Sequence, residues 1–271
     1  MDTSNTLLET QKEIERIFNK NQLMFRVKSE FKKEPEIKEI MDKFNIPNDF
    51  GYDFLAQMAL HKRANIQTIV GLLRHHYDNG QMVVNMIVQC IHADLVDWFD
   101  DLRVLVTKFE LSKDVQEELD KFQFPLPMVV PPKKVQCNKE TGYLLSGGSL
   151  ILKNNYHEDD ICLDHINRVN RIQLKLDMDT AKMVKNQWKN LDKQKIGETW
   201  EDFQKRNKAF DKYNSTTLKV MELIDQASDC FYLTHAYDKR GRTYCRGYHI
   251  NYQGNEWNKA VIEFKNQEIT Q

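Results

Sequence analysis

A proline-rich segment in the middle of the chain limits what its backbone can form. Residues 124–132 read F-P-L-P-M-V-V-P-P and contain four of the six prolines among 271 residues. Proline has no backbone N–H to donate, and it disrupts the interior of a helix or of a central strand. The segment is therefore expected to be extended chain or an edge strand that separates two differently organised parts.

Residues 1–123 are predicted to form an N-terminal helical domain. Apolar residues between Leu7 and Phe18 recur near helical spacing, with charged residues between them. The segment 82–106 carries apolar residues on nearly every face. Because a helix that is apolar all round is normally buried, this segment is expected to be the central helix of the domain.

The C-terminal half is predicted to combine helices with a small amount of antiparallel β structure. Helix is expected over residues 160–190 and, beyond the break at Gly197, over residues 198–229. Residues 231–233 and 242–250 are rich in aromatic and β-branched residues and are expected to be strands. The predicted fold class is therefore mainly α with minor antiparallel β.

A β-hairpin is predicted shortly after the proline-rich segment. The turn S-G-G-S at residues 146–149 lies between two apolar runs, residues 143–145 and 150–152. With this hairpin included, the predicted divisions of the chain are residues 1–123, 124–165, 166–230 and 231–271.

Composition excludes several classes of protein. No apolar run approaches the 18 or so residues of a membrane span, and the N-terminus has no basic region followed by an apolar stretch, so neither membrane insertion nor a secretory signal is expected. The five cysteines are scattered, and no two form a C-x-x-C pair. This usage indicates a reducing compartment and argues against a disulfide framework or a zinc module.

Charge is unevenly distributed along a chain whose formal net charge is −1. Residues 166–246 contain 17 Lys and Arg against 11 Asp and Glu, a balance of +6, so the remainder sums to −7. A basic segment of this kind suits a surface that faces a polyanion. An ordinary solvated helical face would have a similar composition.

Three cations and one carboxylate are packed around a glycine in Asp238-Lys239-Arg240-Gly241-Arg242, which lies between the two expected strands. Gly241 allows a close backbone approach or a positive φ. If the chain is extended, Arg240 and Arg242 point to the same side, where two guanidinium forks suit successive phosphates. Asp238 is expected to brace an arginine, and Tyr244 offers a flat surface on which a base or sugar can stack.

This region resembles the D-x-x-G-R region of the single-subunit, phage and mitochondrial-type RNA polymerases. There an F-P/L-x-x-x-D-x-R-G-R-x-Y run leads into N-P-Q-G-N-D-x-x-x-K, and here the second run reads N-Y-Q-G-N-E at residues 251–256, followed by Lys259. The resemblance implies that the region opens the palm and grips the template strand and the RNA–DNA hybrid. It implies nucleic-acid contacts by Asp238, Lys239, Arg240, Gly241, Arg242, Tyr244, Gln253, Asn255 and Lys259.

A second resemblance lies upstream, where P-M-V-V-P-P-K at residues 127–133 is similar to the V-V-P-P-K-P-W stretch of the same family. There a glycine-rich hairpin follows and wedges apolar residues between base pairs at the upstream edge of the melted DNA. Packing against the helical domain is the alternative for this hairpin. A weaker similarity at residues 167–188 implies that the family's thumb corresponds to residues 198–229. The hairpin residues concerned are Tyr143, Leu144, Leu145, Gly147, Gly148 and Leu150.

The family's catalytic D-x-S-G and H-D-S runs do not occur in this sequence. Two carboxylates holding two Mg²⁺ ions are needed for the nucleotidyl transfer. The chain therefore resembles the small subunit of the two-chain, middle-transcription RNA polymerases of N-four-like phages. This implies no catalytic residue on the chain, Mg²⁺ held by a larger catalytic subunit in a heterodimer, template DNA and nascent RNA as ligands, and possible recruitment by a single-stranded-DNA-binding factor. It implies the cytoplasm of an infected bacterial host as its location.

Two other interpretations remain open. The chain is alternatively a non-enzymatic, nucleic-acid-binding regulatory helical protein, or a structural subunit without nucleic-acid contacts. No metal site is expected on the chain itself. The adjacent His75 and His76 are expected to point apart on a helix and to form a partly exposed structural pair.

Overall fold

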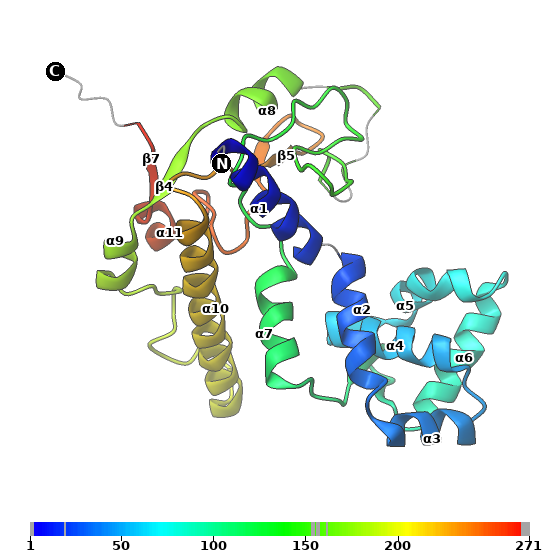
Figure 1. Ribbon diagram of the computed structural model, residues 1–271. Coiled ribbons are helices and arrows are strands. Elements are labelled where there is room, and N and C mark those ends of the chain that lie inside the picture. The colour runs from blue at the N-terminus through cyan, green and yellow to red at the C-terminus, as the bar shows by residue number, and fades with distance from the viewer. Residues whose placement is uncertain (1–2, 19, 153–154, 156–157, 161, 267–271) are drawn as a thin grey trace. The chain divides into compact units, whose positions relative to one another are not determined.

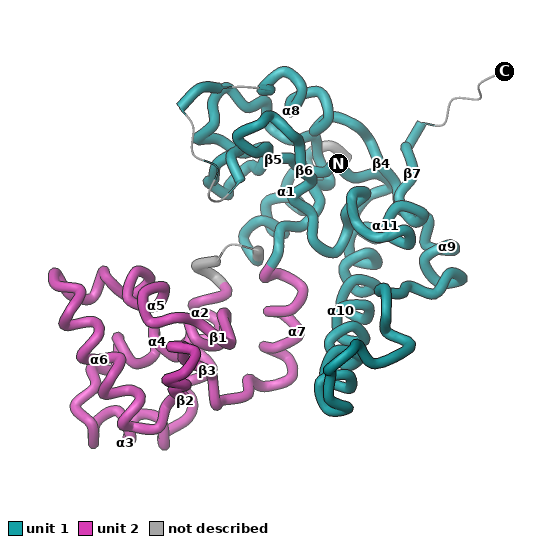
Figure 2. Tube along the Cα trace, turned by 180° about the vertical axis from the view of Figure 1, so that it is seen from behind, with its two compact units in different colours: residues 1–19, 124–271 teal, residues 20–123 magenta. Residues whose placement is uncertain are grey.

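The computed structural model describes residues 3–18, 20–152, 155, 158–160 and 162–266 (Figure 1). The chain divides into two compact units, shown in different colours in Figure 2. The first, here called the helical unit, is Lys20–Gln123; the second, the mixed unit, joins Met1–Asn19 to Phe124–Gln271.

The helical unit contains most of its residues in helices, as predicted, but also a small three-stranded sheet. The sheet is antiparallel throughout, in the order β1-β3-β2. The elements of this unit are α2 (Lys20–Phe31), α3 (Pro35–Lys43), α4 (Asn48–His61), β1 (Arg63–Asn65), α5 (Ile66–Leu73), the short 3-10 helix η1 (Arg74–His76), α6 (Gly80–His92), β2 (Val96–Phe99), β3 (Val104–Thr107) and α7 (Lys113–Phe122).

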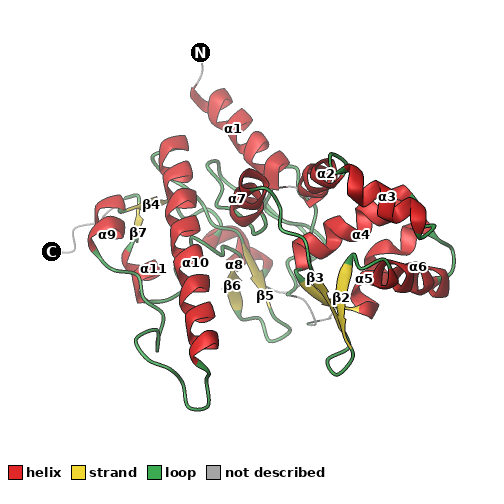
Figure 3. Cartoon of the chain, turned by 90° about the horizontal axis from the view of Figure 1, so that it is seen from below, coloured by secondary structure: helices red, strands yellow, loops and turns green. Residues whose placement is uncertain are grey.

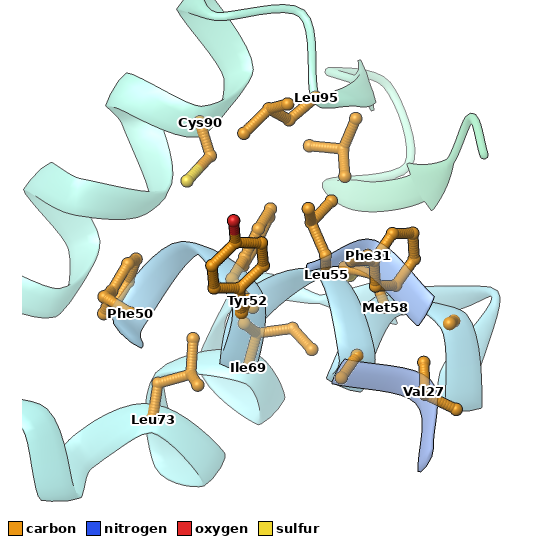
Figure 4. Close-up of a cluster of buried hydrophobic side chains, with 14 of the residues drawn as sticks. Val27, Phe31, Phe50, Tyr52, Leu55, Met58, Ile69, Leu73, Cys90 and Leu95 are labelled. Carbon is orange, nitrogen blue, oxygen red and sulfur yellow. The ribbon is translucent and has the colours of Figure 1, made fainter. Parts of the chain in front are cut away.

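Helix α4 is the centre of the helical unit. Every residue from Phe50 to Leu60 is buried, and Figure 4 shows side chains of α4 among those of α2, α5 and α6. The close-up labels Val27, Phe31, Phe50, Tyr52, Leu55, Met58, Ile69, Leu73, Cys90 and Leu95, all of which belong to one buried hydrophobic cluster.

The central helix predicted over residues 82–106 was placed wrongly. Helix α6 ends at His92, and Asp94 takes a positive φ of 57°, which ends helical geometry. The residues that follow form the β2–β3 hairpin, in which Leu105 is fully buried. The apolar residues of this segment therefore come from two kinds of element, so they do not follow one period.

The mixed unit combines the longest helix with two small antiparallel sheets, β4-β7 and β5-β6. Short strands and long helices are evident in Figure 3. Its elements are α1 (Thr3–Phe18), α8 (Leu163–Val169), β4 (Leu174–Leu176), α9 (Met178–Met183), α10 (Trp200–Ala227), β5 (His235–Tyr237), β6 (Thr243–Cys245), α11 (Glu256–Ala260) and β7 (Ile262–Phe264). The fold class, mainly α with minor antiparallel β, is confirmed.

Helix α10 confirms the second long helix predicted over residues 198–229. Thr199 caps its start: its hydroxyl accepts a hydrogen bond from the Asp202 N–H at 3.1 Å and donates one to the Asp202 carboxylate at 2.8 Å. The C-terminal end of α10 contacts α9 and β4 (Figure 1). The helix predicted over residues 160–190 is confirmed only in part, because the segment contains two short helices, α8 and α9, with strand β4 between them.

Strand β4 forms because its residues pair with other segments of the chain. Leu174 exchanges two backbone hydrogen bonds with Phe231, at 2.8 and 2.9 Å, and β4 also pairs with β7. These partners are distant in sequence, so they override the local preference for helix. Likewise, the strand predicted over residues 242–250 is limited to β6.

The hairpin predicted around residues 146–149 is not formed by the two apolar runs. Leu150 donates its N–H to the Asn138 carbonyl at 2.9 Å and accepts from the Tyr237 N–H at 2.8 Å. Leu152 donates to the Tyr237 carbonyl at 3.0 Å. The second run therefore lies beside β5, and its apolar pattern reflects burial against that strand.

Helix α1 belongs to the mixed unit, so the boundary predicted for a domain over residues 1–123 differs at its start. The buried carboxylate of Glu15 accepts hydrogen bonds from three successive backbone N–H groups, those of Leu144, Leu145 and Ser146, at 2.8, 2.6 and 3.2 Å. Gln11 accepts from the Val129 N–H at 2.8 Å and donates to Glu15 at 2.9 Å. These bonds hold residues 129 and 144–146 to α1.

Among the described residues, no helix has both the length and the apolar character needed to cross a membrane.

We expect Glu15→Ala to destabilise the mixed unit by about 3 kcal/mol, because three backbone N–H groups lose the buried, charged carboxylate that accepts their hydrogen bonds. The free energy of unfolding, measured in urea by tryptophan fluorescence, checks this, since three of the four tryptophans lie in the mixed unit. Glu13→Ala removes an exposed carboxylate from the same helix and should change stability by less than about 0.5 kcal/mol. Equal effects of the two substitutions would contradict the role assigned to Glu15.

Candidate functional site

The basic motif forms the loop that joins β5 to β6. The two strands pair with His235 opposite Cys245 and Tyr237 opposite Thr243. The Asp238 N–H donates to the Arg242 carbonyl at 3.0 Å, and the Gly241 N–H donates to the Asp238 carbonyl at 2.9 Å. Residues 238–242 are therefore a tight turn, so the extended chain on which the same-side placement of Arg240 and Arg242 depended is not formed.

Gly241 is required by this turn. Its φ is +79°, in the region that side-chain-bearing residues rarely adopt. A Cβ atom there would also lie 3.2 Å from the sulfur of Cys162. Of the two roles expected for Gly241, a close backbone approach or a positive φ, the structure shows the positive φ.

The carboxylate of Asp238 organises the loop from inside. One oxygen, Oδ1, accepts from the backbone N–H groups of Arg240 at 2.9 Å and Arg242 at 3.1 Å. The other, Oδ2, accepts from Arg242 Nε at 2.7 Å, lies 2.6 Å from Arg242 Nη2, and accepts from the Tyr244 hydroxyl at 3.5 Å. The structure thus confirms the predicted bracing of an arginine by Asp238.

Burial and hydrogen bonding act on the Asp238 carboxyl in opposite directions. The side chain is 5% exposed, and burial by itself raises its pKa. Hydrogen bonds from Arg242 and Arg240, together with the charge of Arg242, lower the pKa further than burial raises it, to about 2. Asp238 is therefore ionised at neutral pH, and its interaction raises the pKa of Arg242.

The three cations of the loop face solvent to different extents. Lys239 is exposed. The Arg240 side chain is 66% exposed, with Nε 3.7 Å from Asp238, so its guanidinium donors remain largely available. Arg242 is 55% exposed; Nε and Nη2 are bonded to Asp238, and the guanidinium lies 5.7 Å from the centre of the Tyr244 ring. Arg242 is thus fixed in place and Arg240 is comparatively free.

Gln253 and Asn255 have structural partners, so the direct nucleic-acid contacts predicted for them are not favoured by the geometry. Gln253 accepts from the Cys245 N–H at 2.7 Å and donates to the Thr243 carbonyl at 3.1 Å, which occupies the free edge of β6. Asn255 caps α11 through the Asn258 N–H at 2.8 Å. The resemblance predicted both residues as nucleic-acid contacts but could not show that their amides are already bonded within the chain.

The third predicted residue of this group, Lys259, is exposed on α11 and lines an open cleft of about 970 Å³. The opposite wall is the segment after α9, which Asn255 holds through Asn186 at 2.9 Å and Trp257 holds through the Val184 carbonyl at 3.0 Å. The residues of this cleft that carry charge or aromatic surface are Lys185, Trp188, Lys189, Asp192, Glu256, Trp257 and Lys259.

Trp188, on the wall of this cleft, is 38% exposed. Its ring packs against Phe210 at 5.2 Å and Tyr213 at 5.3 Å between ring centres, so one side is held while another stays open to the cleft. The flanking Lys185 and Lys189 were the available signal, because basic residues around an aromatic residue are typical of single-strand binding surfaces.

The residues predicted to wedge between base pairs are mostly buried. Tyr143 is 5% exposed and donates its hydroxyl to the Leu126 carbonyl at 2.8 Å; Leu150 is 1% exposed. Leu144 is half-buried, whereas Leu145 is 48% exposed beside the exposed Gly147 and Gly148. Packing is favoured for Tyr143 and Leu150, and Leu145 is the apolar side chain of this group that projects.

No protein-family model matches the sequence, and no curated protein matches it significantly.

We expect Asp238→Asn to lower stability by an amount that depends on pH. The pKa of this carboxyl is about 2 in the folded chain, below its ordinary value of 3.8, so ionisation stabilises the folded state above about pH 4. That stabilisation is lost as the pH falls towards 2. The difference in free energy of unfolding between wild type and variant should therefore shrink over this window, in urea titrations at fixed pH values.

Asp211→Asn is the matched control, because it removes one exposed carboxylate from α10. If it reproduced the same pH-dependent difference, the effect would not belong to the turn.

Proposed function

We propose that the chain binds nucleic-acid phosphates through the turn Asp238–Arg242, as the template- and hybrid-binding subunit of a two-chain RNA polymerase of the single-subunit type. The observation that carries the proposal is the buried Asp238 carboxylate, which holds Arg242 while Arg240 stays 66% exposed. An ordered cluster of three cations around one buried carboxylate favours an anionic ligand.

The resemblance at residues 231–264 connects this turn with a polymerase. In the family, the corresponding region grips the template strand and the RNA–DNA hybrid. The turn geometry supports the transfer of that role to Arg240 and Lys239 in particular, since both are exposed, whereas Arg242 is already bonded to Asp238. Phosphate contacts of this kind position a strand without reading its sequence.

A larger partner would supply the catalytic carboxylates and their Mg²⁺. The C-terminal strand β7 supports a partner on this side: among the described strands it pairs with β4 alone, and Phe264 is 62% exposed. A strand edge with an exposed aromatic side chain is suited to pairing with another chain. Completion of this small sheet by the partner's palm is part of the proposal.

The cleft lined by Lys185, Trp188 and Lys259 is a second surface that suits a nucleic-acid strand. Its lysines can neutralise phosphates, and the open part of the Trp188 ring can stack on a base. Asp192 and Glu256 on its walls reduce the net positive charge. The cleft is therefore assigned a supporting role, and the turn the principal one.

Arg240→Ala is expected to weaken binding to an RNA–DNA hybrid scaffold without loss of stability. It should reduce the slope of log K against log salt by about 1, because one phosphate contact is lost. Arg242→Ala should weaken binding as well, but it also removes the closer of the two cations paired with the buried Asp238, so the free energy of unfolding should fall too. Fluorescence anisotropy at two salt concentrations and urea unfolding separate the two effects.

Arg63→Ala is the charge-matched control, since Arg63 is an exposed arginine on β1 of the helical unit. An unchanged affinity and salt slope for Arg240→Ala would make the turn a structural feature. If binding depended on the turn but template-directed RNA synthesis did not appear when the chain was co-expressed with a chain carrying D-x-S-G and H-D-S runs, the regulatory nucleic-acid-binding protein would replace the polymerase subunit.

A further inference from the structure

A compact group of metal-ligand side chains lies in the helical unit, which contains none of the motifs that support the proposed function. Asp53 of α4 and His75 and His76 of η1 each present one ligand atom, and these atoms lie within 4.8 Å of one another. His75 Nε2 is 3.3 Å and His76 Nε2 2.7 Å from Asp53 Oδ2. The expectation that the two histidines point apart is wrong, since their ring centres are 4.3 Å apart.

The backbone changes direction at the two histidines. Helix α5 ends at Leu73, and the next three residues form a single 3-10 turn before Tyr77 becomes extended. The rings of Phe50 and His76 pack in a T-shaped arrangement with their centres 5.4 Å apart, and His76 is 16% exposed. His76 is therefore held by packing, whereas His75 is 62% exposed and leaves the group open to solvent.

The hydrogen-bond partner of His75 orients its ring. Its Nδ1 lies 3.2 Å from the carbonyl oxygen of Leu72. A carbonyl oxygen can only accept, so Nδ1 carries a proton, as it does in many metal-binding histidines. Nε2 is then the ring atom directed at Asp53 Oδ2, 3.3 Å away, and it is available as a metal ligand.

The carboxylate of Asp53 can bind two cations at once, one at each oxygen. Lys28 forms an ion pair with Oδ1, which leaves Oδ2 directed at the two imidazoles. The Asp53 side chain is 9% exposed, so a charge here is poorly solvated and needs compensation by its neighbours. A bound metal on Oδ2 would complete that compensation while Lys28 remains on Oδ1.

We propose that Asp53 Oδ2, His75 Nε2 and His76 Nε2 bind a zinc-class divalent cation, with water in the remaining position on the exposed side of His75. Two imidazoles and one carboxylate suit Zn²⁺ and not Mg²⁺, which prefers oxygen ligands. With zinc–ligand bonds near 2.0–2.2 Å, tetrahedral ligand atoms lie about 3.3 Å apart. The His75–Asp53 separation of 3.3 Å already fits, and the His76–Asp53 separation of 2.7 Å has to widen by about 0.6 Å.

Such an ion would join η1 to α4, the buried centre of the helical unit. Because the ion binds the folded arrangement of these three residues, it would stabilise this unit by mass action. This inference does not rest on the proposed function, and either can fail without the other.

The experiment uses the full chain without a histidine tag, freed of metal by chelation and titrated with Zn²⁺ in a calorimeter. One equivalent should bind, and Co²⁺ in its place should give the visible absorption of a four-coordinate site. His75→Ala should weaken Zn²⁺ binding at least about 10-fold and abolish the Co²⁺ absorption. Since His75 is exposed, that variant should fold, and circular dichroism checks this.

His92→Ala is the matched control, because it removes an exposed histidine from the end of α6 and should leave Zn²⁺ binding unchanged. Mg²⁺ should give no comparable binding heat. Three results would each overturn the proposal: no stoichiometric Zn²⁺ binding, unchanged affinity in His75→Ala, or equal losses in the two variants. The group would then be an ion-pair network between the histidines, Asp53 and Lys28.

Discussion

The backbone between residues 124 and 152 forms no helix and no paired strand of its own, so its buried N–H and C=O groups must find partners elsewhere. Much of the mixed unit is arranged to supply them. Glu15 and Gln11 of α1 accept from four of these N–H groups. The side chain of Asn167 takes the place of a neighbouring strand at Val135, accepting from its N–H at 2.8 Å and donating to its carbonyl at 2.9 Å.

The same requirement places the candidate site. Met128 exchanges backbone hydrogen bonds with Tyr232 at 2.7 and 2.8 Å, and Tyr237 is bonded on one side to Leu150 and Leu152. Both ends of the segment 232–237 are thereby fixed by the irregular chain beside it. The turn Asp238–Arg242 follows directly, so its cations project from a supported strand pair and not from a free loop. Precise placement of charged groups needs this kind of support.

Local features were predictable from the sequence where the cause is local. Gly241 indicated a position where a positive φ is possible, and the charged run after Gly197 indicated helix α10. The pairing of Asp238 with an arginine was also predicted. Each of these features depends on residues within a few positions of one another. Predictions failed where the cause is distant in sequence. Strand β4 forms because it pairs with Phe231 and with β7. Helix α1 belongs to the mixed unit because its Gln11 and Glu15 side chains accept hydrogen bonds from backbone N–H groups more than a hundred positions away.

The convergence of His75 and His76 on Asp53 was missed for the same reason, since the sequence pattern gave no sign of the 3-10 turn or of the carboxylate 22 positions earlier. Gln253 and Asn255 show a different limit. Their place in the resembling motif predicts nucleic-acid contacts, but in the structure their amides complete a strand edge and cap a helix. Existing partners of this kind cannot be read from a motif.

The different freedom of Arg240 and Arg242 has a consequence for binding. A long side chain that becomes ordered on contact with a ligand loses roughly 0.5–1.5 kcal/mol of conformational freedom. Arg242 is already held by Asp238, so its side chain loses this conformational freedom when the chain folds. The side chains of Arg240 and Lys239 would lose theirs only on binding a ligand. Under the proposed function, the turn therefore combines one fixed cation, which sets where an anionic group lies, with two exposed ones that are free to adjust to the spacing of successive phosphates.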